Sequence, residues 1–524
     1  MGRPWFGTPP RRLDKRRAGR YLAASRRLSP TRADSMLLDA LLEARRSRAG
    51  TLAVADAHLA LSYKQLSQLA FVFRDVFVSE SACPRVGLLL PASAVFPAAL
   101  FGCFWAGRTA VPLNFLLSGE ELGPIVADAG LDLVLAVRHF EALCGRLPAR
   151  TVFVEDLPLK RKAAVSLIRR LPDPPAVAPD DTAVILYTSG TTAEPKGVEL
   201  AHRNLHSNCV DSIASLNIDR DHSFLNILPP FHVFGLTANV LVPVALGATV
   251  HAVPRFSPVA SVKAVAEKGI SVMMAIPSMY GAMLRTKSAK REDFRSIYLA
   301  ISGGEPLPDG VRNGFEERFG VVLRQGYGLT ETSPVVSAGA AEGYKPGTVG
   351  KPIRNVEVDI VDPDGHRLGR GQDGEILVRG PNVMKGYYGK PEQTREVIDA
   401  DGWFHTGDVG RLDEDGFLSI TGRAKEMLII GGENVFPREI EAVLESHEGV
   451  IQAAVIGVCD DTRGEAPVAF VIPQAGAAVD EATLRNHARK VLAGYKVPKQ
   501  VIIREDLPTG PTGKILKRRL PELL

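Results

Sequence analysis

The sequence contains little cysteine, and the cysteines it has are not arranged in pairs. Five cysteines are scattered over 524 residues, and none belongs to a Cys-x-x-Cys motif. An odd number without close spacing argues against a disulfide framework and against a structural zinc site. We therefore expect a protein of a reducing compartment such as the cytoplasm.

The sequence also lacks a large net charge once its first residues are set apart. Residues 1–32 contain ten Lys or Arg and one acidic residue, and the rest of the chain contains 53 basic against 58 acidic residues. The body of the protein is thus mildly acidic, although the whole chain has a formal charge of +4. A nucleic-acid site needs a basic surface, so we expect no nucleic-acid partner.

No segment has the form of a signal peptide, and a charge-free stretch of membrane-spanning length is interrupted by prolines. This stretch, residues 86–106, contains Pro91 and Pro97. We expect a buried strand followed by a buried helix there, with a membrane span as the alternative. Contact with a membrane is expected to be peripheral at most.

Two stretches are basic. Residues 1–35 are predicted to form a disordered, dispensable extension, because apolar residues at helical spacing begin directly after Met36. A transit-like or membrane-surface segment and a gene start placed too far upstream are the alternatives. Residues 155–180, which are also rich in proline, are interpreted as a surface linker between subdomains, with a membrane-facing patch as the alternative.

The most informative stretch is segment 187–197, which reads YTSGTTAEPKG. It follows an apolar run, residues 182–186, and precedes helical apolar spacing that begins at Leu205. Two glycines, four hydroxyl residues besides the tyrosine and one lysine are what a phosphate-holding loop needs. The Walker pattern fails, because Pro195 and Gly197 stand where glycine and Ser or Thr are required. We expect a nucleotide site of another class; a plain polar strand-to-helix connection is the alternative.

Three further apolar runs end in polar corners in the same way. Ligands of open α/β sheets bind beyond the carboxyl ends of parallel strands, so one cleft could gather these corners together with segment 187–197. The runs are residues 272–276, 297–301 and 321–323, which lead to Pro277-Ser278, Ser302-Gly303-Gly304-Glu305 and Gln325-Gly326-Tyr327-Gly328.

The chain is too long for one core and is expected to contain two or three domains. After residue 347, Asp-Gly turns between short alternating strands predict a β-rich subdomain. Strands are expected near residues 453–458, 468–472 and 501–503, and a helix over 481–492. These elements predict a small α+β domain that begins close to Gly422-Arg423.

Five motifs in a fixed order carry a family resemblance. From about Met36 to its end, the chain resembles the adenylate-forming superfamily of acyl-CoA synthetases, luciferase-like enzymes and adenylation domains. The implied fold is α/β: a large N-terminal domain of stacked α/β subdomains plus a β-rich subdomain, residues 36–424, and a small mobile α+β domain, residues 425–524. The motifs are 187–197, 325–332 (QGYGLTET), 403–408 (WFHTGD), 422–426 (GRAKE) and 508–514 (PTGPTGK).

The resemblance implies a two-step reaction that uses ATP, Mg²⁺ and coenzyme A. A carboxylate attacks the α-phosphorus of ATP to give acyl-adenylate and pyrophosphate, and a thiol then displaces AMP. Positive charge is needed where the two anions meet. The resemblance gives this role to Lys514, which without it would be read as a solvated lysine of the tail.

The same resemblance assigns the nucleotide and metal contacts. Glu331 would hold magnesium, a cation that prefers oxygen ligands, and Thr330 would donate to a phosphate. Tyr327 would offer its ring to adenine, Asp408 would accept from the ribose hydroxyls, and Arg423 would be its neighbour. The β- and γ-phosphates are assigned to Lys196, Thr188, Ser189, Gly190, Thr191 and Thr192, and the adenine side to Gly303, Gly304, Glu305, Gly326 and Gly328.

The remaining assignments concern the acid, the hinge and CoA. His232 resembles the aromatic residue beside the carboxylate path, and we expect it to position substrate, because a carboxylate nucleophile needs no base. Lys425 falls at the family hinge. Gly431 and Gly432 would let pantetheine pass, and Arg255 is a candidate for the CoA phosphates.

The chain departs from the family pattern at two places. Ala193 stands where many members have glycine, which stiffens the loop. Ile429 and Gly431 lie near positions where plant aromatic-acid ligases carry lysine, which puts the details of CoA binding in doubt.

We expect the acid to be a medium- or long-chain fatty acid. Small residues at Gly235, Ala238 and Gly303, with apolar Val335-Val336, favour an aliphatic chain over a charged amino acid. Transfer to a carrier-protein thiol and activation of an aromatic acid are the alternatives within the class. An inactive acyl- or nucleotide-binding module and a P-loop ATPase are the alternatives outside it, and the oligomeric state is left open.

Overall fold

The computed structural model describes residues 37–159, 171–188, 195–340, 343–460, 462–474, 476–509 and 515–524. Some predicted features therefore lie outside the described residues. They are the extension 1–35, four residues assigned to phosphate (Ser189, Gly190, Thr191 and Thr192), Ala193 and Lys514.

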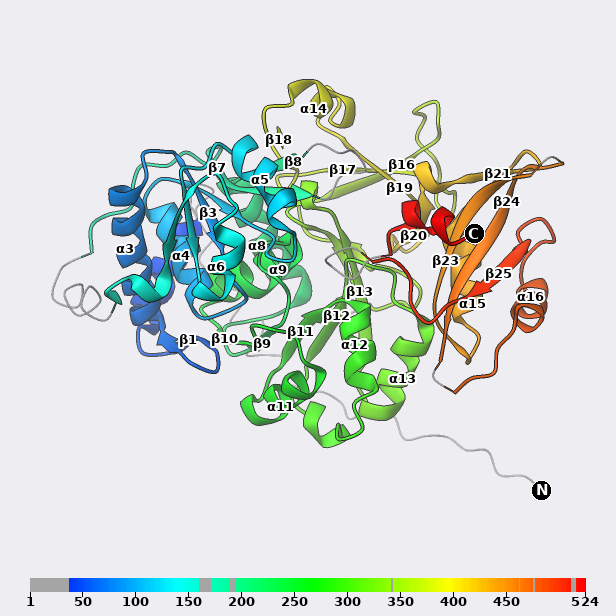
Figure 1. The fold of residues 1–524 in the computed structure, drawn as a ribbon, viewed down its shortest axis with the longest axis horizontal. Coiled ribbons are helices and arrows are strands. Elements are labelled where there is room, and N and C mark those ends of the chain that lie inside the picture. Colours follow the sequence, from blue (N-terminus) through cyan, green and yellow to red (C-terminus); the bar gives the residue numbers. More distant parts are fainter. Residues whose placement is uncertain are drawn as a thin grey trace.

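A mainly parallel seven-stranded sheet forms the first layer, at the left of Figure 1, in the order β18-β8-β7-β4-β3-β5-β6. Strands β8 and β18 are antiparallel to their neighbours and form one edge of the sheet. The strands are β3 (Arg85–Leu89), β4 (Thr109–Pro112), β5 (Leu133–Ala136), β6 (Arg150–Phe153), β7 (Thr182–Thr188), β8 (Lys196–Ala201) and β18 (Gly386–Tyr387). Its helices are α3 (Tyr63–Glu80), α4 (Val95–Trp105), α5 (Gly119–Asp128) and α6 (Glu141–Cys144), with short turns η1 (Arg138–Phe140) and η2 (Val154–Asp156).

The charge-free stretch 86–106 forms strand β3 and helix α4, as predicted. Helix α4 is apolar all round because it is buried between the first sheet and α3. At Gly102 the two helices approach so closely that a Cβ would lie 2.7 Å from Phe73 Cβ. No helix among the described residues is long and apolar enough to cross a membrane.

A nine-stranded sheet forms the second layer, in the order β15-β14-β13-β12-β11-β9-β10-β1-β2. Strands β1, β10, β9, β11, β12 and β13 are parallel, and the outer strands are antiparallel. The strands are β1 (Leu52–Ala55), β2 (Ala60–Ser62), β9 (Ser223–Asn226), β10 (Thr249–Ala252), β11 (Val272–Ala275), β12 (Leu299–Ser302), β13 (Leu323–Gly328), β14 (Val335–Ala338) and β15 (Lys351–Pro352). The helices are α2 (Leu37–Arg48), α8 (His202–Leu216), α9 (Val233–Leu236), the π-helix η3 (Thr237–Leu241), α10 (Val242–Leu246), α11 (Pro258–Lys268), α12 (Pro277–Leu284) and α13 (Asp309–Phe319), with the turns η4 (Arg291–Phe294) and η5 (Thr330–Thr332).

Helices cover both faces of each sheet, which explains the apolar runs of the strands. Phe224 packs in the large core that the two sheets share with α3, α4, α8 and α10. Its neighbour Leu225 points to the opposite face, into the core beneath α11, α12 and α13. Leu88 and Leu89 divide in the same way on the first sheet. This arrangement brings the strand ends that follow the apolar runs to one side of the molecule.

The predicted β-rich subdomain is an antiparallel sheet in the order β16-β17-β19-β20. Three of its predicted Asp-Gly turns contain a glycine with positive φ, at Gly365, Gly402 and Gly416. The fourth pair differs, because Gly374 begins strand β17. The elements are β16 (Glu357–Val361), β17 (Gly374–Arg379), α14 (Pro391–Val397), β19 (Phe404–Leu412) and β20 (Leu418–Arg423).

The C-terminal domain has a five-stranded sheet and a hydrophobic core of its own, at the right of Figure 1. The expected strands are confirmed, and the expected helix over 481–492 ends earlier, at Arg489. The predicted fold class is therefore confirmed. The elements are η6 (Ala424–Glu426), β21 (Leu428–Ile430), β22 (Glu433–Val435), α15 (Pro437–Glu445), β23 (Val450–Asp460), β24 (Gly464–Pro473), α16 (Glu481–Arg489), β25 (Gln500–Ile503) and η7 (Lys517–Leu523).

Two predictions about the motif segments were wrong. Segment 187–197 does not join a strand to a helix, because β8 follows it and pairs with β7 as a hairpin in which Thr188 lies opposite Lys196. The short run Val198 to Leu200 alternates and fits a strand, but the helical spacing after Leu205 masked it. The glycine-rich corner after residue 323 is also a strand, because β13 continues to Gly328 by pairing with β14.

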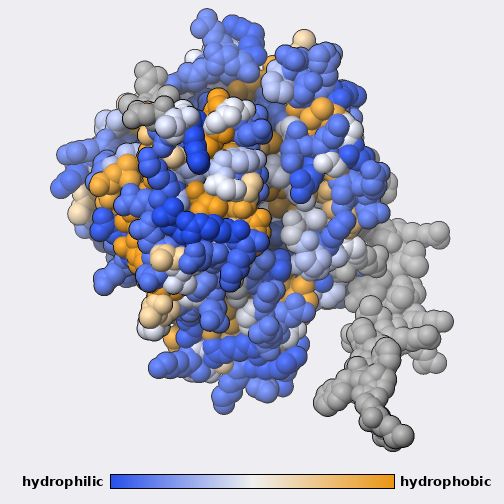
Figure 2. All heavy atoms as spheres, turned by 90° about the vertical axis from the view of Figure 1, so that its right-hand side faces the viewer, coloured by the Kyte–Doolittle hydropathy of each residue, from blue (hydrophilic) through white to orange (hydrophobic). Residues whose placement is uncertain are grey.

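The surface at the right-hand side of Figure 1, where the C-terminal domain lies, is mostly hydrophilic (Figure 2). Hydrophobic side chains of the described residues occur on it in small, separate groups.

Candidate active site

A cavity of 2530 Å³ lies where the three sheets and the C-terminal domain meet. Most of the predicted site residues that the structure describes line it. Asp408 lies behind the wall, and Gly431 and Gly432 lie in the β21–β22 turn, away from the cavity. The lining residues among those predicted are Thr188, Lys196, His232, Arg255, Gly303, Gly304, Glu305, Gly326, Tyr327, Gly328, Thr330, Glu331, Arg423 and Lys425.

The phosphate-loop lysine lies beside the predicted magnesium ligand. Lys196 begins β8, and its Nζ lies 3.5 Å from the ring centroid of Tyr387 on β18. The Tyr387 hydroxyl donates a 3.0 Å hydrogen bond to Glu331 Oε1 in turn η5. Burial lowers the pKa of Lys196, and the Glu331 carboxylate partly opposes this. Sequence reasoning missed Tyr387; its only signal was the Gly-Tyr-Tyr sequence at 386–388.

Three residues form the predicted adenosine side. Tyr327 Oη donates a 2.7 Å hydrogen bond to Asp408 Oδ2, and Arg423 Nε lies 2.7 Å from Asp408 Oδ1. Asp408 and Arg423 are directly opposed on β19 and β20. Burial, and then the nearby Asp408 charge, raise the pKa of Tyr327 well above its ordinary value. The Asp408 side chain is only 5% exposed, and each of its oxygens contacts one of these two partners.

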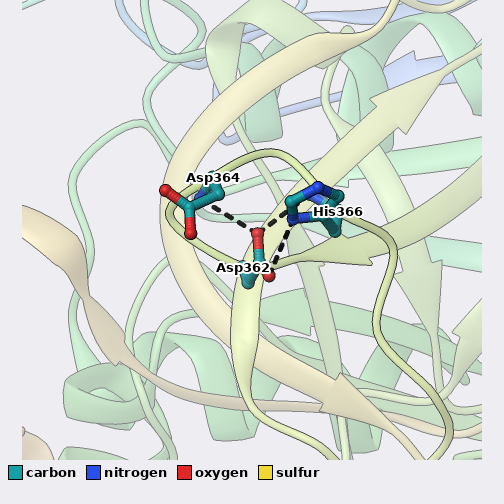
Figure 3. A group of neighbouring side chains, drawn as sticks. All are labelled: Asp362, Asp364 and His366. Carbon is teal, nitrogen blue, oxygen red and sulfur yellow. Dashed lines mark hydrogen bonds and ion pairs between the residues drawn. The ribbon is translucent and has the colours of Figure 1, made fainter.

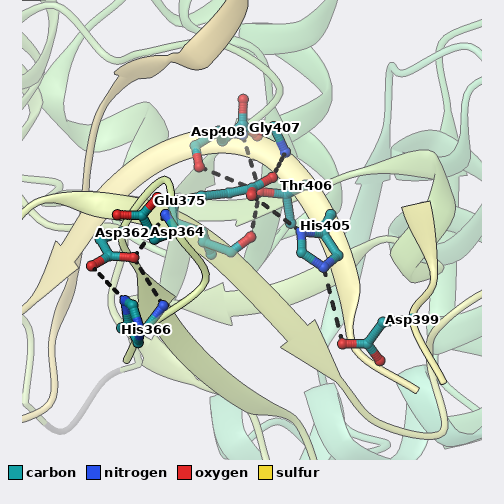
Figure 4. A network of polar contacts seen from close by, with 10 residues as sticks. Asp362, Asp364, His366, Glu375, Asp399, His405, Thr406, Gly407 and Asp408 are labelled. Carbon is teal, nitrogen blue, oxygen red and sulfur yellow. Dashed lines mark hydrogen bonds and ion pairs between the residues drawn. The ribbon is translucent and has the colours of Figure 1, made fainter. Parts of the chain in front are cut away.

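Strand β17 holds the segment that leads to Asp408 (Figure 4). Thr406 Oγ1 donates to the Ile376 carbonyl at 2.7 Å and accepts from the Asp408 amide at 3.1 Å. Glu375 accepts from the Gly407 amide at 3.1 Å and contacts His405 Nδ1 at 3.1 Å. These contacts fix the backbone on either side of Gly407, which has a φ of 69°. The 403–408 motif is therefore a rigid support for the carboxylate.

His232 is the N-cap of helix α9 and lines the cavity. Its Nδ1 accepts a 3.2 Å hydrogen bond from the Phe234 amide. This contact fixes the orientation of the ring at the cavity wall. Nearby Gly235 is required by packing, because a Cβ there would lie 2.3 Å from the Pro229 carbonyl oxygen.

One wall of the cavity lies between helices α9–α10 and strands β11–β14 and contains no charged residue. Its polar groups are paired within the protein, because Thr237 Oγ1 donates to the Ser333 carbonyl and Ser337 Oγ to the Val349 carbonyl. Of the predicted pocket residues, Ala238, Gly303 and Val335 belong to the lining, whereas Gly235 and Val336 are buried behind it. The wall is formed by Val233, Phe234, Thr237, Ala238, Val242, Met274, Ile276, Met279, Ile301, Pro334, Val335, Ser337 and Ala338.

The C-terminal tail contacts the predicted hinge. Lys425 lies in turn η6, and the neighbouring Glu426 Oε2 is 2.7 Å from Lys517 Nζ. The same ammonium lies 2.8 Å from Glu441 Oε1 of helix α15. Burial opposes the charge of Lys517, but Glu441 and Glu426 outweigh it and raise the pKa of the ammonium. The tail that follows residues 510–514 is thus attached beside the hinge.

A second group of possible metal ligands lies outside the cavity, in the turn between β16 and β17 (Figure 3). Asp362, Asp364 and His366 each offer one ligand atom within 4.8 Å of the others. Asp362 Oδ1 already accepts 2.9 Å hydrogen bonds from the amides of Asp364 and His366. These bonds close an exposed Asp-Pro-Asp-Gly-His turn, so the group has a structural explanation and we assign it no metal.

Comparison with known proteins identifies the family of the chain. The family model described as AMP-binding enzyme matches residues 42–388, and that of the AMP-binding enzyme C-terminal domain matches residues 439–514. A feruloyl-CoA synthase of Amycolatopsis sp is 37% identical over 482 residues, which cover 90% of this chain and 96% of the relative. A long-chain-fatty-acid–CoA ligase of Salmonella typhimurium is 35% identical over 478 residues, covering 83% and 84%.

A solved structure shows the same fold. ATP-bound MatB from Rhodopseudomonas palustris matches with a TM-score of 0.85 and 31% identity, covering 94% of this chain and 99% of that one. The sequence resemblance and the predicted enzyme class are thereby confirmed. The chain belongs to the AMP-binding enzyme family and is an AMP-forming acid–CoA ligase, which activates a carboxylic acid with ATP and joins it to CoA.

Proposed function

We propose that the acid is a medium- or long-chain fatty acid. The observation that carries this proposal is the uncharged wall between α9–α10 and β11–β14, whose two hydroxyls are already paired with backbone carbonyls. Burying an unpaired polar or charged group of the substrate against such a wall is costly, whereas each buried methylene contributes about 0.8 kcal/mol. The similarity to a long-chain-fatty-acid–CoA ligase supports the same choice.

The second candidate is an aromatic acid. The feruloyl-CoA synthase favours it, because it is the more similar of the two relatives and matches 90% of this chain. A ring would also pack against the uncharged wall. The two candidates differ in what the far end of the wall must bury, a flexible alkyl chain or a ring with polar substituents.

In the first step, the carboxylate attacks the α-phosphorus of ATP and pyrophosphate leaves. Lys514 is proposed to bridge the carboxylate and the α-phosphate, and Lys196 and Thr188 to grip the β- and γ-phosphates. His232, whose ring is oriented by its contact with Phe234, is proposed to position the acid. No base is needed, because the nucleophile is already an anion.

Magnesium fits the donor set near the phosphates. Glu331 lines the cavity with Thr330 and Thr188, and carboxylate and hydroxyl oxygens are the donors that Mg²⁺ prefers. When bound, the ion would neutralise charge on the leaving pyrophosphate. We propose Glu331 as its protein ligand, and Tyr327, Asp408 and Arg423 as the residues that hold adenosine.

In the second step, the CoA thiol attacks the acyl carbonyl and AMP leaves. We propose that residues 425–524 rotate about Lys425 between the steps, which withdraws Lys514 and opens a path for the thiol. Gly431 and Gly432 have positive φ values of 62° and 86° and lie outside the cavity, so they would reach the thiol path only after such a rotation. Arg255 is proposed to contact the CoA phosphates. The five free cysteines support a reducing compartment such as the cytoplasm.

The proposal is tested by acid-dependent ATP–pyrophosphate exchange, followed by thioester formation with CoA. The panel contains octanoate, palmitate, oleate, benzoate, coumarate, ferulate and an amino acid. We expect the highest kcat/KM with an aliphatic acid of eight or more carbons. A higher kcat/KM with ferulate or coumarate would replace the fatty acid by the aromatic acid as the proposed substrate.

A further inference from the structure

We propose that Tyr387 is a positioning residue that holds Lys196 and Glu331 for the phosphates and the magnesium ion. This inference rests on the function proposed above for those two residues. Tyr387 itself lines the cavity, but none of the five motifs includes it. It lies about 190 residues after Lys196 in the chain and reaches it through the pairing of β18 with β8.

The ring of Tyr387 contacts the lysine. Lys196 Nζ lies 3.5 Å from the ring centroid, within the range of a cation–π interaction. A partly buried ammonium loses hydration free energy. The electron-rich face of the ring offsets part of this loss by a cation–π interaction, without a conventional hydrogen-bond acceptor. The N–H groups of Lys196 that point away from the ring thereby stay available to phosphate oxygens.

The hydroxyl of Tyr387 contacts the carboxylate. It donates a 3.0 Å hydrogen bond to Glu331 Oε1. A tyrosine that served only to fill the core would need no hydroxyl, because phenylalanine has the same ring. Here the hydroxyl orients one carboxylate oxygen, and the second oxygen keeps its lone pairs for a cation. One side chain thus fixes the cation through its ring and the carboxylate through its hydroxyl.

The backbone around Tyr387 supports this role. The Met384 amide donates to the Glu331 carbonyl at 2.8 Å, and the Tyr388 amide donates to the Gly197 carbonyl at 2.8 Å. Residues 384–388 are therefore joined at one end to the turn with Glu331 and at the other to the strand with Lys196. Tyr387 is 8% exposed, so its ring is held between them.

The test uses isothermal titration calorimetry of the full-length protein without carboxylic acid, so that ATP binds and does not react. ATP with Mg²⁺, ATP with EDTA, and AMP are titrated into the wild type, Tyr387→Phe and Tyr387→Leu. Tyr388→Phe is the matched control, because Tyr388 is the next residue, its ring contacts Arg85, and it is not part of the cavity lining.

Each variant has its own expected result. Tyr387→Phe keeps the ring and loses the hydrogen bond, so ATP with Mg²⁺ should bind about fivefold more weakly, while ATP with EDTA and AMP bind as in the wild type. Tyr387→Leu also loses the ring face, so ATP should bind about fivefold more weakly with EDTA as well. Tyr388→Phe should match the wild type in all three titrations.

Unchanged affinity of Tyr387→Phe for ATP with Mg²⁺ would overturn the inference. An equal loss of AMP and ATP affinity would also overturn it, because AMP lacks the β- and γ-phosphates and its loss would indicate a general structural defect. These outcomes leave the proposed function intact as long as the wild type binds ATP. A wild type that binds neither ATP nor AMP would overturn both.

Discussion

Tyr327 Oη donates a 2.7 Å hydrogen bond to Asp408 Oδ2 and so joins strand β13 of the nine-stranded sheet to strand β19 of the four-stranded sheet. Arg423 occupies the other carboxylate oxygen at 2.7 Å. The carboxylate that is proposed to accept from ribose therefore already has a protein partner on each oxygen. Each carboxylate oxygen has two lone pairs, so ribose can bind Asp408 only by sharing these oxygens with Tyr327 and Arg423 or by displacing one of them.

Tyr327→Phe is expected to bind AMP as well as the wild type, or up to about threefold more tightly, because it keeps the ring and frees Asp408 Oδ2. Asp408→Asn should bind AMP about tenfold more weakly, because it removes the charge that the ribose hydroxyls and Arg423 both use. Calorimetric titration of AMP measures both changes. A tenfold loss in Tyr327→Phe would mean that its hydroxyl contacts the nucleotide directly.

Much of this site could be predicted from sequence, because its residues lie in short glycine-rich motifs next to apolar strands. Lys196, Tyr327, Glu331 and Arg423 come from three motifs, and the structure places them all on one cavity. The rule that strand ends meet at one edge of a sheet explains only part of this convergence, because Lys196, Tyr327 and Arg423 belong to three different sheets. The family resemblance supplied the rest.

The residues that were missed depend on strand pairing across long sequence distances. Strand β8 was hidden by the helical spacing that follows it, and with it the antiparallel edge that brings β18 next to Lys196. Tyr387 lies in a two-residue strand, and no local pattern identifies so short an element. The hydrogen bond from Tyr327 to Asp408 joins side chains of two different sheets. The spacing of apolar residues along the sequence does not predict such a contact.

Lys517→Met is expected to destabilise the C-terminal domain. The ammonium lies within 2.8 Å of both Glu426 and Glu441, and its loss leaves two carboxylates close together, which costs about 3 kcal/mol. Urea unfolding at pH 8 measures the loss. Lys496→Met is the matched control. Lys496 pairs with Glu439, which lies on the same helix as Glu441 and is 44% exposed, so the loss of this ion pair should lower the unfolding free energy less.

The ion pairs of Lys517 should also make the stability of the wild type depend on pH. The pKa of Lys517 is raised in the folded protein, so its stabilising effect is fully present below about pH 10.4, the ordinary lysine value, and is lost as pH rises through the folded pKa. Unfolding free energies measured from pH 9 to 11.5 should therefore fall more steeply in the wild type than in Lys517→Met. Equal slopes would contradict the prediction.

His202 should make the protein sensitive to mild acid. It is buried on α8 against Phe104, and burial lowers its pKa to about 4, against opposing charges at Asp181 and Asp39. The unfolded chain takes up a proton near pH 6.5, so stability should fall by about 3 kcal/mol as pH falls from 6.5 to 4. The free energy of unfolding, measured in urea, should fall less steeply with decreasing pH in His202→Phe than in the wild type.

Ala238→Phe tests the uncharged wall. Ala238 lines the cavity and is 4% exposed, so a larger side chain there occupies space proposed for the acyl chain. We expect kcat/KM for palmitate to fall at least tenfold, which corresponds to about 1.4 kcal/mol, while hexanoate is spared. Ala238→Ser, which is nearly the same size, is the control. An equal loss for both acids would mean that the chain does not pass Ala238.

Lys514→Ala should separate the two steps of the reaction. The lysine is proposed to stabilise the charge that develops between carboxylate and α-phosphate, an interaction that exists only in the adenylation transition state. Acid-dependent ATP–pyrophosphate exchange should therefore fall at least about a hundredfold, the usual effect of removing one such group. Thioester formation from synthetic acyl-adenylate and CoA should change less than about threefold, because the lysine is withdrawn in that step. Lys490→Ala, on the surface of the same domain, controls for loss of charge. An equal loss in both steps would contradict a rotation about Lys425 and would mean that one arrangement of the two domains serves both reactions.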